Sequence, residues 1–144
     1  MFYISPNAGE DLKPLSQIVS SGEAARVMLA LKKALTKVDP IGTLIFDEID
    51  AQIGGRLGTI TGKKLKELSK HRQLILITHL PQIASFADKH FKVIKDVKNQ
   101  HTNTKIILLS HEQKIEELAK MMSGEEKSNI ALTHAKDMLK SANL

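Results

Sequence analysis

The stretch that decides the fold is residues 43–50, which read TLIFDEID. Four apolar or β-branched residues in a row, without polar alternation, predict a strand buried on both faces. Two adjacent acids, Asp47 and Glu48, follow at once, and Asp50 is a third acid just beyond them. Because burying an unpaired charge is costly, acids at the end of such a strand call for a physical reason.

The rest of the chain alternates strand-like and helix-like segments. Apolar residues at helical spacing predict helices over 22–37 and about 56–69. A short apolar run over 73–78 predicts a second buried strand. Strand, helix and strand in this order predict an α/β fold, with a mostly parallel sheet flanked by helices. The remaining expectations are a loop over 5–17, a short helix over 81–87, a hairpin of 91–97 with 104–109, and closing helices over 111–122 and 126–139.

Composition excludes several classes of protein. The 144 residues are 42% hydrophobic and carry a net charge of +5, which fits one domain or a piece of one. No stretch approaches the roughly 20 apolar residues that cross a bilayer, and no signal peptide is recognisable, so no membrane partner is expected. The absence of cysteine excludes disulfides and thiolate sites and fits a reducing compartment. The lysines are spread along the chain, which fits solvated helix faces and permits weak attraction to nucleic acid.

Two strand ends carry the polar groups that could do chemistry. Asp47 and Glu48 follow the first strand, and Thr78 and His79 end the second. Ligands of parallel sheets bind beyond the carboxyl ends of strands, so neighbouring strands would bring the acids and the imidazole together. Such a site suits a phosphate bound to Mg²⁺, with one carboxylate holding the hydrated cation and the next positioning an attacking water. The alternative is that the acids cap a turn and face solvent.

A second signal lies at the start of the 22–37 helix. Ser20 and Glu23 have the spacing of a capping box, and the free backbone N–H groups of a helix start can also bind phosphate. The stretch GTITGKK at 58–64 does not fit the phosphate-binding loop G-x-x-x-x-G-K-[ST], so these residues contain no such loop of their own. The six histidines form no ligand-spaced pair, and no zinc site is expected.

Three segments together resemble a known family. They are SSGEAAR at 20–26, TLIFDEIDAQIGG at 43–55 and LILITHLPQIASFAD at 74–88. In order and spacing they resemble the RecN family of bacterial DNA repair ATPases, in the structural-maintenance-of-chromosomes (SMC) and ABC-type class, and the likeness covers nearly the whole chain. It implies the C-terminal lobe of an ABC/SMC-type P-loop NTPase head that lacks its Walker A half. Residues 1–144 would form a single domain, as a fragment of that head.

The resemblance also implies roles for residues at matching positions. Asp47 would be the Walker B aspartate that holds Mg²⁺ through water, and Glu48 the catalytic glutamate that polarises the attacking water. His79 would be the switch histidine that touches the γ-phosphate of ATP. The other implied residues are Ser21, Gly22 and Glu23 of the signature motif, which grips the ATP bound to the opposite head, Arg26 at the basic position of that motif, and Asp50 of the D-loop, which communicates between heads.

The chain departs from the family pattern in two ways. Ser21 stands where the family usually has the first glycine of the signature motif, and a Cβ there could weaken the grip on phosphate. The Walker A loop and the glutamine-containing switch loop are missing from the 144 residues. We therefore expect the N-terminal half of the same head as a partner, and no ATPase activity from the isolated chain.

The resemblance implies ATP hydrolysis in DNA double-strand break repair, with ATP sandwiched between two heads of a homodimer. DNA is the implied partner, and the cytoplasm, at the nucleoid, is the implied location. An alternative is a non-catalytic dimerisation or interaction module derived from the same fold. A third possibility is a metal-dependent phosphatase that uses Asp47, Glu48 and Asp50 and acts without the other half.

Overall fold

The structure is a computed structural model, and it describes residues 3–5, 9, 11–14, 21–35, 38–47, 49–51, 53–98, 101–124 and 128–142. The chain divides into two compact units. Unit 1 comprises Met1–Ile53 with Leu68–Thr78, and unit 2 comprises Gly54–Glu67 with His79–Leu144. The expectation that residues 1–144 form a single domain stays a prediction.

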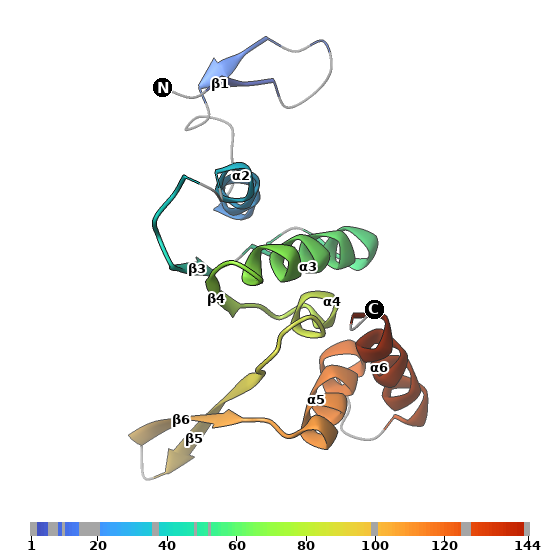
Figure 1. Cartoon of the computed structure of the whole chain (residues 1–144). Coiled ribbons are helices and arrows are strands. Elements are labelled where there is room, and N and C mark those ends of the chain that lie inside the picture. The colour runs from blue at the N-terminus through green and yellow to red at the C-terminus, as the bar shows by residue number, and fades with distance from the viewer. Residues whose placement is uncertain are drawn as a thin grey trace. The chain divides into compact units, whose positions relative to one another are not determined.

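Unit 1 is built around a pair of parallel strands. β3 (Thr43–Asp47) pairs in parallel with β4 (Gln73–Ile77), with Thr43 opposite Gln73 and Asp47 opposite Ile77 (Figure 1). This pairing confirms the predicted parallel arrangement of the two strands. Helix α2 (Ser21–Ala34) precedes them in the chain. The remaining strands, β1 (Tyr3–Ile4) and β2 (Lys13–Pro14), form a short antiparallel pair, and β2 lies within the 5–17 segment predicted to be a loop.

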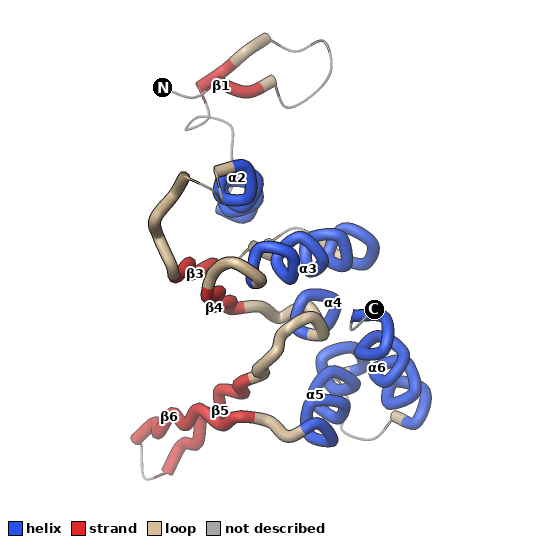
Figure 2. Tube along the Cα trace, viewed as in Figure 1, coloured by secondary structure: helices blue, strands red, loops and turns tan. Residues whose placement is uncertain are grey.

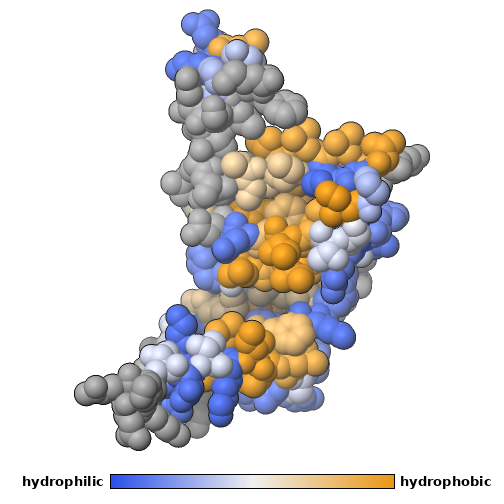
Figure 3. Space-filling model, turned by 90° about the vertical axis from the view of Figure 1, so that its left-hand side faces the viewer, coloured by the Kyte–Doolittle hydropathy of each residue, from blue (hydrophilic) through white to orange (hydrophobic). Residues whose placement is uncertain are grey.

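Only one face of the β3–β4 pair is buried, so the expectation of burial on both faces is wrong for this chain. On β3, Leu44 is 8% exposed and Phe46 is 5% exposed, whereas Ile45 between them is 69% exposed. On β4, Ile75 and Ile77 are 45% and 58% exposed. The space-filling view shows hydrophobic surface on this side of the molecule (Figure 3). The unbroken apolar run is suited to a sheet covered on both sides, and nothing in the described part of the chain covers the second side.

A buried arginine directly before β4 binds the segment that connects α2 to β3. Arg72 donates from Nη1 to the carbonyl of Ile41 at 2.6 Å and from Nη2 to the carbonyl of Asp39 at 2.9 Å. Its Nη1 also lies 3.3 Å from Oδ2 of Asp39, which accepts a 2.6 Å hydrogen bond from Lys32. The hydrogen bond from Lys32 holds the pKa of Asp39 below its usual value. The cluster ties α2, β3 and β4 into one unit.

Unit 2 is mainly helical, with a hairpin of two long strands (Figure 2). The hairpin confirms the expectation for this region. Helix α5 begins with a capping box between Ser110 and Gln113 and ends at Gly124, whose φ of 72° suits glycine. The elements are α3 (Gly55–Ser69), whose last residues belong to unit 1, α4 (Pro81–Ala84), β5 (Phe91–Lys98), β6 (His101–Leu108), α5 (His111–Ser123) and α6 (Asn129–Ala142).

The core of unit 2 is small and aliphatic. It joins α4, α5 and α6, and Leu118 and Ala135 in it are completely buried. Small side chains let these helices approach closely, so this core forms without aromatic residues. The buried members of this cluster are Ala84, Leu118, Ala119, Ala131, Ala135 and Leu139.

A close contact between α3 and the end of α4 depends on Gly62. A Cβ at this position would lie 2.4 and 2.8 Å from two ring carbons of Phe86 and 3.0 Å from the carbonyl of Gln82. Gly62→Ala should therefore lower the free energy of unfolding by about 1 kcal/mol, because overpacking outweighs the gain in helix propensity. Chemical denaturation would measure the change. Gly58→Ala is the matched control, since its Cβ would meet only side-chain atoms at 3.2 Å or more, and equal stability of the two variants would contradict the packing argument.

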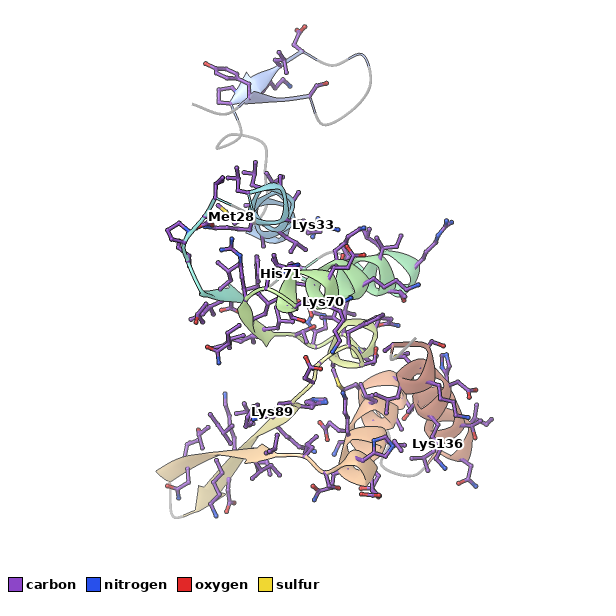
Figure 4. All side chains as sticks on the ribbon, viewed as in Figure 1. Met28, Lys33, Lys70, His71, Lys89 and Lys136 are labelled. Carbon is purple, nitrogen blue, oxygen red and sulfur yellow. The ribbon has the colours of Figure 1, made fainter. Side chains whose placement is uncertain are left out.

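Lysine side chains are distributed over several elements, as the sequence indicates. Lys33 lies on α2, Lys70 follows α3, Lys89 precedes β5 and Lys136 lies on α6 (Figure 4). Several lysines are paired with acids, including Lys66 with Asp88 and Lys92 with Glu117. The positive charge is therefore spread over the surface and partly neutralised.

Candidate functional site

The two strand ends singled out in the sequence leave the sheet at the same edge. Asp47 is the last residue of β3, is exposed, and lies opposite Ile77, the last residue of β4. Thr78 and His79 follow Ile77 directly in the chain. The register therefore sets the acid-bearing and histidine-bearing ends level with one another. The meeting of Glu48 with His79 in one pocket stays a prediction, because Glu48 lies outside the described residues and His79 belongs to unit 2.

Asp50 has a different environment from Asp47. It is 2% exposed, and its Oδ2 accepts a short hydrogen bond from the hydroxyl of Thr78. A buried carboxylate needs such donors, because its desolvation is otherwise uncompensated. Asp50 is thus held within its own unit, beside the end of β4. This bond was not anticipated from the sequence, although the register places both residues just beyond paired strands.

The backbone around Asp50 is held from the other side by α2. Arg26 donates from Nη1 to the carbonyl of Ala51 at 3.1 Å and to that of Ile49 at 3.4 Å. These two carbonyls flank Asp50 in the chain. The resemblance implies a basic position at Arg26, and the structure adds the groups that it contacts.

The residues predicted to form the signature motif make up the first turn of α2. Ser21, Gly22 and Glu23 all have helical backbone, whereas their side chains lie outside the described part of the structure, as does Ser20 of the predicted capping box. A helical φ is open to every L-residue, so serine in place of glycine at Ser21 adds no backbone strain. Backbone N–H groups in the first turn of an α-helix have no partner within the helix, and groups of this kind can bind phosphate.

The donor set fits magnesium held together with a phosphate. In the described residues no group of three or more His, Cys, Asp or Glu side chains could hold a metal ion. Mg²⁺ usually keeps several waters and takes one or two carboxylates plus phosphate oxygens, so a cage of protein ligands is not required. Asp47, exposed at a strand end, is suited to that role.

A separate hollow of about 340 Å³ lies in unit 2, between the segment after α4 and the start of α5. Burial, with a smaller contribution from the charge of Lys114, lowers the pKa of His90. Burial also lowers the pKa of Lys114, whose ammonium donates to the carbonyl of Ala87 at 2.5 Å. Asp88 and Lys89 also line the hollow, so its charge is mixed. None of these residues carries a predicted role.

The chain is similar over nearly its whole length to proteins described as DNA repair protein RecN. That of Treponema pallidum (strain Nichols) is 47% identical over 139 residues, which are 96% of this chain and 24% of the relative. That of Bacillus subtilis (strain 168) is 39% identical over 142 residues, 99% of this chain and 25% of the relative. The chain thus spans about a quarter of the length of these curated relatives. No family model matches it.

Solved structures of SMC proteins share the fold. The Smc head domain with a coiled coil and joint from Pyrococcus yayanosii has a TM-score of 0.61 and 28% identity, over 81% of this chain and 22% of that one. A structure from work on ATP-driven dimerisation and DNA-stimulated activation of SMC ATPases has a TM-score of 0.57 and 29% identity, over 84% and 71% of the two chains. No helix among the described residues is long and apolar enough to span a membrane. The chain therefore corresponds, over nearly its whole length, to part of RecN, and its fold is that of part of an SMC ATPase head.

Proposed function

We propose that this chain is the part of a RecN-like DNA repair ATPase head that supplies the signature motif, the Walker B acids, the D-loop and the switch histidine. The observation that carries the proposal is the in-register parallel pairing of β3 with β4, which brings Asp47 level with the strand end that precedes His79. The similarity to RecN over 96% of the chain supports it. In the complete protein this region acts in ATP binding and hydrolysis during double-strand break repair.

Each site residue has a distinct task in this proposal. Asp47 holds hydrated Mg²⁺ next to the phosphates of ATP, and Glu48 orients and polarises the attacking water. His79 contacts the γ-phosphate. Mg²⁺ bridges the phosphate oxygens and neutralises charge that develops during phosphoryl transfer. The signature turn, Ser21 to Glu23, presents N–H groups to the ATP held by the opposite head.

The partner of the chain is the half of the head that carries Walker A. Apolar side chains on the hairpin support this assignment, because they pair across β5 and β6 on one face and are exposed here. Phe91 and Leu108 are each 54% exposed, and Val93 and Ile106 are 57% and 67% exposed. Exposed apolar surface of this kind marks an interaction site. Two further partners are another copy of the head, joined through sandwiched ATP, and DNA. The proposed location is the cytoplasm, at the nucleoid.

Reconstitution tests the proposal. The 144-residue chain alone should show no Mg²⁺-dependent ATPase activity, because the Lys and backbone cradle for the phosphates is absent from its sequence. Adding the N-terminal half of the same head, with its Walker A loop, should restore hydrolysis of ATP, measured as phosphate release with and without Mg²⁺. Phosphate release by the isolated chain from simple phosphomonoesters would instead favour a metal-dependent phosphatase.

A non-catalytic interaction module is the second candidate. The exposed apolar faces of β3–β4 and of the hairpin favour it, since both suit a partner whether or not ATP is hydrolysed. Under this alternative the reconstituted head forms a complex but does not turn over ATP. Size-exclusion chromatography with an ATPase assay on the same sample separates the two candidates.

A further inference from the structure

The segment Ile49–Asp50–Ala51 is contacted from two sides by residues that belong to different predicted motifs. From one side, Arg26 of α2 donates to the carbonyls of Ile49 and Ala51 at 3.4 and 3.1 Å. From the other side, Thr78 donates its hydroxyl proton to the carboxylate of Asp50. All five residues belong to unit 1. The segment is therefore a bridge between α2 and the end of β4.

The residues that contact the bridge, and the bridge itself, lie close in the sequence to predicted site residues. Arg26 lies one helical turn beyond Glu23, on the helix whose first turn carries the signature residues. Thr78 lies immediately before His79. The bridge itself begins directly after Glu48. A displacement of α2 along its axis would thus be passed to the segment after the catalytic acid and to the residue before the histidine.

Burial makes the bridge stiff. Asp50 is 2% exposed and Ile49 is completely buried, so the segment cannot move out into solvent without losing its packing. The buried carboxylate also keeps its distance from Thr78 fixed, because separation would leave a charged group without that donor. Arg26 spans two carbonyls with one guanidinium, which fixes the direction of the backbone between them.

We propose that Arg26 and Thr78 are positioning residues for ATP hydrolysis, which together couple the phosphate grip at the start of α2 to the placement of His79 through the Ile49–Ala51 bridge. The inference rests on the proposed function for the chemistry of Glu48 and His79. Neither Arg26 nor Thr78 touches the nucleotide in this scheme. Both act through Asp50 and its neighbours, so their effects are not independent of each other.

A double-mutant cycle in the reconstituted head tests the coupling. Arg26→Met and Thr78→Val should each lower kcat about tenfold, because misplaced catalytic groups lose rate steeply with small displacements. KM for ATP should change by less than about twofold, since the Walker A half holds most of the nucleotide. The double variant should be no slower than the slower single variant, because both changes break the same bridge. Thr78→Ser should retain wild-type kcat, because serine keeps the hydroxyl.

Several outcomes would overturn the inference. Independent local effects would multiply in the double variant to a loss of about a hundredfold. Wild-type kcat in Thr78→Val, or equal loss in the control Thr43→Val at the opposite end of the strand pair, would also overturn it. Urea denaturation of each variant identifies any rate loss that comes from partial unfolding.

A measurement on the 144-residue chain separates this inference from the proposed function. If the wild-type head hydrolyses no ATP, the proposed function fails, yet the coupling is still measurable by amide NMR. Thr78→Val should then shift the amide resonances of Ala25 and Arg26 on α2 as well as those of the bridge. Shifts confined to the residues next to Thr78 would overturn the coupling, whatever the ATPase result.

Discussion

In the reconstituted head, Glu48→Gln is expected to lower the rate of ATP hydrolysis by about 100- to 10,000-fold, the contribution usual for a positioned general base. Glutamine keeps the shape of the side chain but neither carries the charge nor accepts the proton of the attacking water. Binding of ATP and Mg²⁺ should survive, because Asp47 and the Walker A half remain. The variant should therefore accumulate as a nucleotide-bound dimer of heads.

Two measurements check this expectation. Steady-state phosphate release gives the turnover, and light scattering with ATP present gives the mass of the complex. Glu116→Gln is the matched control, since it makes the same change at an exposed position of α5 and should hydrolyse ATP at the wild-type rate. Retained turnover in Glu48→Gln would remove Glu48 from the mechanism and favour the interaction module.

The second large effect concerns stability. Arg72→Met should lower the free energy of unfolding of unit 1 by about 2–4 kcal/mol, because Asp39 and two backbone carbonyls lose a buried donor that carries a full charge. The side chain of Arg72 is 3% exposed, and it serves the carbonyls of Asp39 and Ile41 at the entry to β3. Methionine fills much of the same volume, so the change reports mainly on the polar contacts.

Urea denaturation of the 144-residue chain, followed by amide hydrogen exchange in β3 and β4, measures the loss. Arg56→Met provides the matched control, because Arg56 is exposed in the first turn of α3 and should cost little. A loss in Arg72→Met below about 1 kcal/mol, typical of a surface substitution, would contradict the role assigned to this arginine.

Apolar periodicity predicted most of the secondary structure, because it records which face of each element is covered. The runs at β3 and β4 gave the strands, the alternation of strands and helices gave their parallel pairing, and the spacing of apolar residues gave α2 and α3. The same runs gave a wrong prediction of burial. They suit strands in a sheet that is covered on both faces, whereas the described residues cover only one face of the β3–β4 pair. Strand β2 was missed, since a strand of two residues leaves no periodicity to read.

The site was predictable only as far as chain order determines it. Strand ends place Asp47 and Thr78 at one edge, and the register confirms this. The inward turn of Asp50 was not predictable, because an acid two residues beyond a strand can face solvent or the interior with the same sequence. Burial and a donor just beyond the neighbouring strand decide between these orientations, and both arise from contacts between residues distant in the chain.

The one-sided burial of the β3–β4 pair has a consequence for handling the protein. Strand edges without neighbours present rows of hydrogen-bonding groups, and with isoleucines beside them they can template the addition of strands from other molecules. Charged or proline residues that would block such growth do not occur between Thr43 and Phe46 or between Gln73 and Ile77. Yield of well-behaved material should thus rise when the chain is produced together with the proposed Walker A half of the head, which would cover these edges.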